Sequence, residues 1–165
     1  MINFLVSISA FCIGIAGLLY MKRGAIFVPT DKKAINEMVR LLEPHVLDRS
    51  VDLGSGDGRI VIALAQAGAE AHGFEHNRFL AWWSRRAIKS SGLSDRAFIH
   101  VSNFWNIDFS GFSIITVFGI PYIMRRLEKK LEKEIAPGTR IISYTFPLPN
   151  WKPVFHENGI YLYER

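Results

Sequence analysis

A glycine-rich turn between an apolar strand and a helix constrains the fold more than any other feature of this sequence. Residues 50–53 read Ser-Val-Asp-Leu, residues 54–58 read Gly-Ser-Gly-Asp-Gly, and an apolar helical pattern continues to about Ala67. Glycines allow a tight turn and a close approach of a ligand to the backbone, and free N–H groups at a helix start favour an anionic group. A strand, a turn and a helix in this order predict an α/β sheet with a ligand at the end of the strand.

The alternation of strands and helices continues along the chain. We expect strands at residues 50–53, 71–75, 97–101, 113–118, 140–146, 154–155 and 161–163. We expect helices at residues 30–43, from the glycine turn to about 67, at 77–90 and at 122–135. Thr30 and Asn77 are suitable caps for two of these helices. Apolar strands that alternate with helices predict a mostly parallel, doubly wound Rossmann-like sheet covered on both faces. No helix separates the last strands, so an antiparallel hairpin should complete the sheet.

The first part of the chain carries no charge. The 20 lysines and arginines and the 15 aspartates and glutamates all follow Met21. The uncharged stretch has about the length of a membrane-spanning helix, and Lys22 and Arg23 directly after it favour a cytoplasmic location for the remainder. A cleaved signal peptide, which would have basic residues ahead of the apolar stretch, and a buried helix are the alternatives. The expected organisation is a transmembrane anchor at 1–21, a juxtamembrane lead-in at 22–30 and one domain at 31–165.

Composition excludes several other classes of protein. With 49% hydrophobic and 13% aromatic residues the chain is not disordered, and a single cysteine, Cys12, cannot form an internal disulfide. A chain of 165 residues has no room for a separate substrate domain. The net charge of +5 comes from basic residues at 85–89 and 125–133, the second group interleaved with glutamates. Solvated helix faces are the expected explanation, with contact to an anionic membrane surface or an acidic partner as the alternative, and we expect no nucleic-acid groove. The five histidines are scattered, and no metal site is expected.

The spacing of the glycines distinguishes between nucleotide cofactors. The dinucleotide fingerprint G-x-G-x-x-G/A needs a small residue where Arg59 stands, and here the third glycine comes one position early. The pattern is instead D-x-G-x-G-x-G, the form typical of S-adenosylmethionine sites, in which the carboxylate of the cofactor replaces a pyrophosphate near the backbone donors. The candidate cofactor-binding residues in this turn are Asp52, Gly54, Ser55, Gly56, Asp57 and Gly58.

Further candidate contacts to the cofactor follow the next two strands. Glu75 lies 21 residues after Gly54, where a carboxylate can accept hydrogen bonds from both ribose hydroxyls. Asn103 follows the third strand and is placed to read the adenine amino group, with a local turn-forming role as the alternative. His76 and Phe104 are candidates for packing on the purine, and simple packing within the fold is the alternative for both.

The end of the fourth strand is the expected meeting place of the acceptor and the methyl group. Methyl transfer needs an in-line approach of a neutral nucleophile, so positioning dominates. A lysine acceptor must lose its proton, and an apolar channel lowers its pKa. Phe118, Pro121, Tyr122 and Phe27 are candidates for such a channel. Tyr122 carries the only hydroxyl of the four and is the candidate orienting residue, with packing on the sheet as the alternative.

At these residues the sequence resembles a known family. Residues 24–165 resemble the class I methyltransferases that modify lysines of the mitochondrial adenine nucleotide translocase and the ATP synthase c-subunit, and more distantly short archaeal protein-lysine methyltransferases. The matching segments are 27–30, 51–60, 117–121, 127–131 and Phe-Pro-Leu-Pro-Asn-Trp at 146–151. The resemblance implies cofactor binding by the glycine turn and Glu75, and closure on the substrate side by the lead-in that contains Thr30. Asn103 departs from the acidic residue of the mitochondrial relatives, and Tyr122 is not a fixed feature of the family.

Together these features predict a membrane-anchored, S-adenosylmethionine-dependent protein-lysine N-methyltransferase. Methylation of a lipid or small hydrophobic molecule, and an inactive cofactor-binding module, are the alternatives. The expected partners are a membrane-associated protein with an accessible lysine and the membrane itself, with the chain a monomer. The first 21 residues lack the arginines of a mitochondrial presequence, so we expect a bacterial inner membrane with the domain on its cytoplasmic side, rather than a mitochondrial inner membrane.

Overall fold

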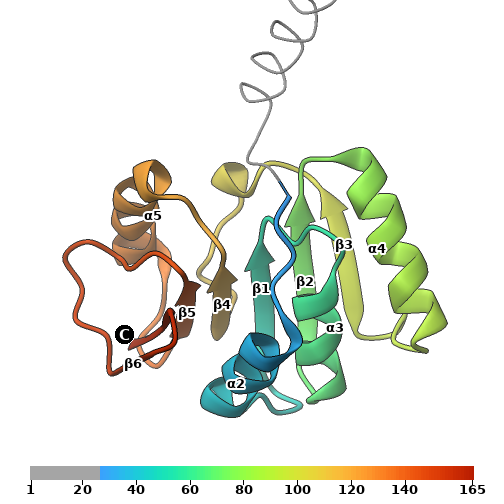
Figure 1. Ribbon diagram of the computed structural model, residues 1–165, viewed down its shortest axis with the longest axis horizontal. Coiled ribbons are helices and arrows are strands. Elements are labelled where there is room, and N and C mark those ends of the chain that lie inside the picture. The colour runs from blue at the N-terminus through green and yellow to red at the C-terminus, as the bar shows by residue number, and fades with distance from the viewer. Residues whose placement is uncertain (1–26) are drawn as a thin grey trace, which may run out of the picture.

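A computed structural model of the chain describes residues 27–165 (Figure 1). The anchor predicted at 1–21 and the start of the predicted lead-in therefore lie outside the described residues. Between Phe27 and Arg165, no helix combines the length and the apolar character needed to cross a membrane.

One seven-stranded sheet organises the domain, in the order β3-β2-β1-β4-β5-β7-β6. The strands are β1 (Arg49–Leu53), β2 (Glu70–Glu75), β3 (Ala97–Val101), β4 (Ile114–Val117), β5 (Arg140–Tyr144), β6 (Phe155–Glu157) and β7 (Ile160–Glu164). The first five are parallel, and β7 runs antiparallel between β5 and β6. The predicted Rossmann-like sheet with a closing hairpin is confirmed. The strand order reverses between β1 and β4, which is where open α/β sheets bind ligands.

The α-helices lie where the sequence pattern predicts them, and their bounds differ from the predicted ones by one or two residues. They are α2 (Lys32–Leu42), α3 (Arg59–Gln66), α4 (Arg78–Ser90) and α5 (Pro121–Glu134), with a short 3-10 helix, η1 (Phe104–Asn106), in addition. Asn77 caps α4 as predicted. The prediction that Thr30 caps the first helix is wrong. Asp31 is the cap, because its carboxylate accepts hydrogen bonds from the backbone N–H groups of Lys33 and Ala34 at 2.9 and 3.0 Å.

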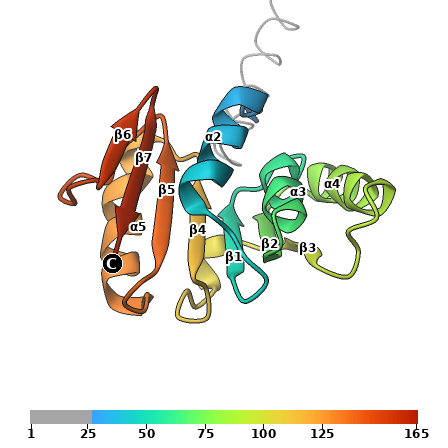
Figure 2. The ribbon, with the colours of Figure 1, turned by 90° about the horizontal axis from the view of Figure 1, so that it is seen from below.

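Two hydrophobic cores lie on the two faces of the sheet. Helices α2, α3 and α4 cover one face, and α5 covers part of the other together with the segment that connects β3 to β4 (Figure 2). The first core includes Leu42, Val61, Leu64, Ile88 and Ile142, and the second includes Leu53, Phe109, Leu127, Ile141 and Tyr163. Because both faces are covered near β1 and β4, these two strands are buried almost throughout.

The proline-containing segment at 146–151 is fixed to α5 by a buried carboxylate. Glu128 is 1% exposed, and it accepts hydrogen bonds from the backbone N–H of Asn150 at 2.8 Å and from the Asn150 side-chain amide at 2.6 Å. The backbone N–H of Leu148 donates to the Tyr163 hydroxyl at 2.9 Å. The segment therefore has a defined position without being a helix or a strand, because side chains satisfy its backbone groups.

Replacing Glu128 by alanine should destabilise the domain by about 2–4 kcal/mol, because two hydrogen-bonded donors of Asn150 lose a charged acceptor in a buried place. Urea unfolding of the variant and of the unchanged chain measures the difference in the free energy of unfolding. Glu132→Ala is the matched control, because Glu132 accepts a hydrogen bond from Trp151 at 3.1 Å in an exposed setting. Glu132→Ala should lower the free energy of unfolding by less than about 1 kcal/mol. Equal losses in the two variants would contradict the role assigned to Glu128.

Candidate active site

The glycine turn between β1 and α3 needs its glycines for two physical reasons. Gly56 and Gly58 have φ angles of 53° and 81°, in the left-handed region that side chains disfavour. A Cβ atom on Gly58 would also lie 1.9 Å from the hydroxyl of Ser84 on α4. The third glycine of the motif therefore lets α4 pack against the start of α3, while Gly54 faces open space, with no atom within 4 Å of an added Cβ.

Glu75, at the end of β2, points its carboxylate into this turn. One carboxylate oxygen accepts a hydrogen bond from the backbone N–H of Gly56 at 2.9 Å, and the other from the backbone N–H of Asn77 at 2.7 Å. The side chain thus joins the turn after β1 to the start of α4. An ionised carboxylate has about four acceptor positions, so Glu75 retains capacity for ligand hydroxyls while it makes both bonds.

Asp52 is the buried carboxylate of the site. It is 3% exposed and accepts a hydrogen bond from the Thr116 hydroxyl at 2.8 Å. Burial is the main cause that raises the pKa of Asp52 to about 7; the bond from Thr116 opposes the rise, and the nearby charges of Glu75 and Asp57 add to it. Asp52 and Glu75 therefore give the turn a negative potential, while the charge of Asp57 is balanced by its ion pair with Arg59.

The lead-in to α2 lies over the glycine turn and is fixed there by Arg59. The Arg59 guanidinium forms an ion pair with Asp57 at 2.6 Å and donates a hydrogen bond to the backbone carbonyl of Thr30 at 2.7 Å. Thr30 itself is buried. The ring of Phe27 rests on Gly56, where an added Cβ would approach the ring to 2.5 Å. The segment with the predicted closing role and the predicted cofactor turn are therefore in contact.

Of the three other candidates for cofactor contact, Asn103 and Phe104 make local interactions. The Asn103 side-chain oxygen accepts a hydrogen bond from the backbone N–H of Trp105 at 3.1 Å and caps η1, as the turn-forming alternative describes. The ring centroid of Phe104 lies 4.8 Å from that of Trp105, and Phe104 packs against the second core. His76 directly follows Glu75 and is exposed. All three follow strand ends on the same edge of the sheet as the glycine turn.

The candidates for the acceptor side lie after β4. Phe118 packs edge-on against Tyr144, with ring centroids 5.0 Å apart. Pro121 is the first residue of α5, a position where its missing N–H has no cost. Tyr122 is 79% exposed, so the alternative in which it packs on the sheet does not hold. Its hydroxyl is accessible to an acceptor at the carboxyl edge.

Three residues that shape the site were absent from the sequence-based candidates. Thr116 stands in the otherwise apolar β4. A single hydroxyl in a buried strand needs a hydrogen-bond partner, so this residue could have been predicted to contact a polar group. In the sequence, Arg59 indicated only a break in the dinucleotide fingerprint. Ser84 gave no sign at all, because its contact with Gly58 depends on the packing of α4.

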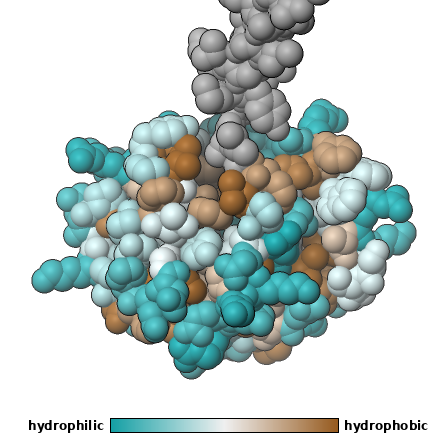
Figure 3. Space-filling view, in the orientation of Figure 1, coloured by the Kyte–Doolittle hydropathy of each residue, from teal (hydrophilic) through white to brown (hydrophobic). Residues whose placement is uncertain are grey.

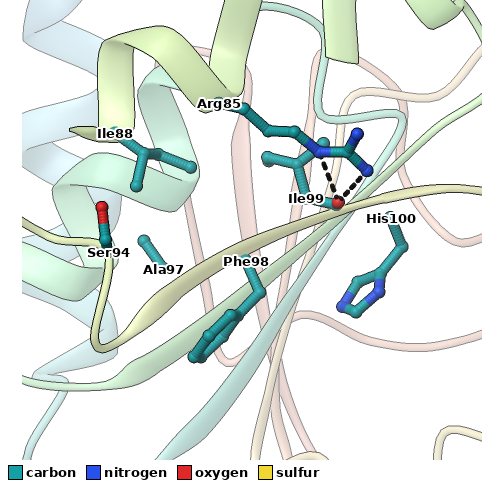
Figure 4. Close-up of a pocket in the computed structure, with 7 residues that line it drawn as sticks. All are labelled: Arg85, Ile88, Ser94, Ala97, Phe98, Ile99 and His100. Carbon is teal, nitrogen blue, oxygen red and sulfur yellow. Dashed lines mark hydrogen bonds between the residues drawn. The ribbon is translucent and has the colours of Figure 1, made fainter. Parts of the chain in front are cut away.

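A separate cavity of about 290 Å³ opens beside the edge strand β3. Figure 4 shows the Arg85 guanidinium from α4 reaching the Ile99 carbonyl, to which it donates two hydrogen bonds at 3.1 and 2.7 Å. The other lining residues are Ile88, Ser94, Ala97, Phe98 and His100. None of the predicted site residues lines this cavity. Arg85 satisfies a carbonyl on the open edge of the sheet, which protects that edge from pairing with another strand.

Comparison with known families decides the identity of the domain. A family model of the ANTKMT methyltransferase domain matches residues 52–155. The chain belongs to this family. The matched region starts at Asp52 of the glycine turn and includes Glu75 and the segment at 146–151. The predicted family, an S-adenosylmethionine-dependent methyltransferase of the protein-lysine type, is confirmed.

Individual relatives agree with the ANTKMT assignment. The ATP synthase c-subunit lysine N-methyltransferase of Rattus norvegicus is 42% identical over 127 residues, which are 77% of this chain and 58% of the relative. A protein-lysine N-methyltransferase of Saccharolobus islandicus is 35% identical over 129 residues, 77% of this chain and 80% of the relative. The chain spans little more than half the length of the rat, mouse and human relatives, at 58%, 51% and 54%.

A solved structure has the same fold as this ANTKMT-type domain. It is described as an RNA methyltransferase from Salinibacter ruber in complex with S-adenosyl-L-homocysteine. The TM-score is 0.78 at 30% sequence identity, and the match covers 83% of this chain and 93% of that one. The fold and the cofactor class predicted from the glycine spacing agree with this comparison.

The buried Asp52 should make the stability of the ligand-free domain fall as the pH rises. Its pKa is about 7 in the folded chain, against an ordinary value of 3.8, so between these values the folded chain holds a proton that the unfolded chain has lost. The free energy of unfolding then falls by up to about 1.4 kcal/mol per pH unit from this group alone. Asp52→Asn removes the titration and keeps the acceptor oxygen for Thr116.

Urea unfolding of both proteins at a series of pH values between about 5 and 8 measures this effect. The stability of Asp52→Asn relative to the unchanged chain should rise with pH and level off above about pH 7. A difference that stays constant across the series would show that Asp52 titrates normally.

Proposed function

We propose that the chain is an S-adenosylmethionine-dependent protein-lysine N-methyltransferase that acts on a membrane-associated protein. The observation that carries this proposal is the similarity to the Saccharolobus islandicus protein-lysine N-methyltransferase, because the match extends over 80% of that relative. That protein-lysine N-methyltransferase is therefore little longer than the region it shares with this chain, and it has no large additional domain. The rat, mouse and human relatives, which are also lysine N-methyltransferases, support the same acceptor chemistry.

The residues around the glycine turn fit S-adenosylmethionine. The carboxylates of Asp52 and Glu75 lie beside the turn and would favour a ligand that carries a sulfonium and an ammonium group, and the open space at Gly54 would let the ligand approach the backbone. Glu75 would hold the ribose hydroxyls through its remaining acceptor positions. When bound, the cofactor would supply an activated methyl group. Phe27 would cover the turn from the lead-in side and exclude water from it.

The acceptor side of the site favours a neutral amine. Phe27, Phe118 and Tyr122 lie at the carboxyl edge of the sheet, and an apolar surrounding lowers the pKa of a lysine that enters it. The lysine would lose its proton to water before its nitrogen accepts the methyl group. The Tyr122 hydroxyl would orient the amine as a hydrogen-bond partner. No strong base is needed, because positioning supplies most of the rate enhancement in such a transfer.

Membrane attachment through the uncharged N-terminal stretch is part of the proposal. It rests on the sequence of residues 2–21 and on the basic pair Lys22 and Arg23 that follows. We place the domain on the cytoplasmic side of a bacterial inner membrane. There the acceptor lysine would belong to a protein in, or bound to, the same membrane.

Removal of either carboxylate should weaken cofactor binding. Asp52→Ala and Glu75→Ala each remove a hydrogen-bonding partner in a buried or half-buried place, and a loss of about 1–3 kcal/mol is expected for each. Isothermal titration calorimetry with S-adenosylmethionine measures the affinity. Glu157→Ala is the control, because Glu157 is an exposed carboxylate on β6 at the far edge of the sheet, and it should change the affinity by less than about 0.5 kcal/mol. Unchanged affinity in the Glu75 variant would refute its assigned role.

The acceptor class can be identified with a labelled cofactor. Membranes from cells that lack the protein are incubated with the full chain and S-adenosylmethionine labelled in its methyl group. Label in acid-resistant protein bands, recovered as methyllysine after hydrolysis, is the expected result. Label in extracted lipid or in RNA would overturn the protein-lysine assignment, and RNA is included because of the described function of the Salinibacter ruber relative. A chain that binds the cofactor but labels nothing would support an inactive binding module.

A further inference from the structure

Helix α4 presents an aromatic face to solvent. Phe79, Trp82 and Trp83 are 64%, 50% and 54% exposed, and their spacing places them on one side of the helix. The ring centroid of Phe79 lies 5.9 Å from that of Trp82 and 6.4 Å from that of Trp83, so the rings form one patch. The opposite side of the helix, with Ala81 and Ile88, is buried against the sheet. Single exposed apolar residues are ordinary, but a contiguous aromatic patch marks a contact surface.

The same helix is basic. Its charged residues are Arg78, Arg85, Arg86 and Lys89, and it contains no aspartate or glutamate. The Arg86 guanidinium carbon lies 5.2 Å from the centroid of the Trp82 ring, and a shallow hollow of about 280 Å³ opens between Trp82, Trp83 and Arg86. Tryptophan and phenylalanine beside arginine and lysine are the residues that lie at the boundary between lipid headgroups and acyl chains. The positive charge is complementary to an anionic lipid surface.

The patch starts at the edge of the sheet where the described chain begins. Helix α4 directly follows β2 at its carboxyl end, which is the upper edge in Figure 1, and Phe27 contacts Gly56 at the same edge. Val28 and Tyr122, both exposed, also belong to this edge, and hydrophobic side chains lie along the top of Figure 3. Only five residues separate Phe27 from the uncharged stretch, which gives a reach of about 20 Å when extended.

We propose that the aromatic face of α4, formed by Phe79, Trp82 and Trp83, enters the headgroup region of an anionic bilayer. The inference rests on the proposed membrane attachment and extends it. A single tether limits the distance of the domain from the membrane but not its orientation. A second contact through α4 turns the carboxyl edge of the sheet, with the glycine turn and Tyr122, toward the lipid surface. Lysines at the membrane boundary then become the accessible acceptors.

Quenching of tryptophan fluorescence by brominated lipid tests this contact in the full chain. Trp105→Phe/Trp151→Phe retains only Trp82 and Trp83. Trp82→Phe/Trp83→Phe/Trp105→Phe retains only Trp151, whose indole N–H donates to Glu132 near the end of α5, away from the carboxyl edge. Both variants are reconstituted in vesicles of phosphatidylcholine and phosphatidylglycerol with bromine on the acyl chains near the headgroups. Emission from Trp82 and Trp83 should fall about twofold relative to unbrominated vesicles, and more than emission from Trp151.

The contact should also depend on lipid charge, with weaker quenching of the α4 pair in vesicles of phosphatidylcholine alone. No quenching of Trp82 and Trp83, or equal quenching of Trp151, would overturn the proposal. Cross-linking between copies through α4 without quenching would overturn it in favour of a second copy of this chain. Circular dichroism and urea unfolding of both variants verify their folding. A folded chain that shows quenching but binds no S-adenosylmethionine in calorimetry would count against the proposed reaction alone.

Discussion

The carboxylate of Glu75 is the interaction on which the site depends most. Its two oxygens bind the backbone N–H groups of Gly56 and Asn77, and so connect the turn after β1, the end of β2 and the start of α4. These three segments come from different parts of the sequence, and within residues 27–165 no other side chain hydrogen-bonds to both the turn and the start of α4. The conformation of the glycine turn and the start of α4 therefore both depend on this side chain, which would also accept hydrogen bonds from the ribose in the proposed cofactor complex. The sheet positions this carboxylate, and the carboxylate positions the turn.

The candidate site contains a group that lowers the stability of the fold. Within residues 27–165 Asp52 is buried without an ion-pair partner, and burial raises its pKa to about 7. A residue of the same shape without charge would be easier to accommodate there. Away from the site, by contrast, the buried Glu128 has both of its oxygens satisfied by Asn150. The difference agrees with a general pattern, in which unfavourable electrostatics are retained at functional sites and avoided in the rest of the fold.

Local sequence patterns predicted the fold and the turn around which the candidate residues gather, and they were less informative about contacts between distant residues. The glycine turn, the apolar strands and the Asn77 cap follow rules that operate within a few residues, and all occur as expected. The Thr30 cap failed because the neighbouring Asp31 has a carboxylate that reaches two N–H groups. Thr116 was missed because its partner Asp52 is 64 residues away. Only the pairing of β1 with β4 brings the two side chains together, and no local sequence pattern predicts that pairing.

The hydrogen bond from Arg59 to the Thr30 carbonyl has a mechanical consequence. Arg59 belongs to the first turn of α3 and also pairs with Asp57, so its side chain links the lead-in to the glycine turn. A displacement of residues 27–30 would break a hydrogen bond to the same guanidinium that pairs with Asp57 in the turn. One side chain therefore fixes the position of the lead-in relative to the glycine turn.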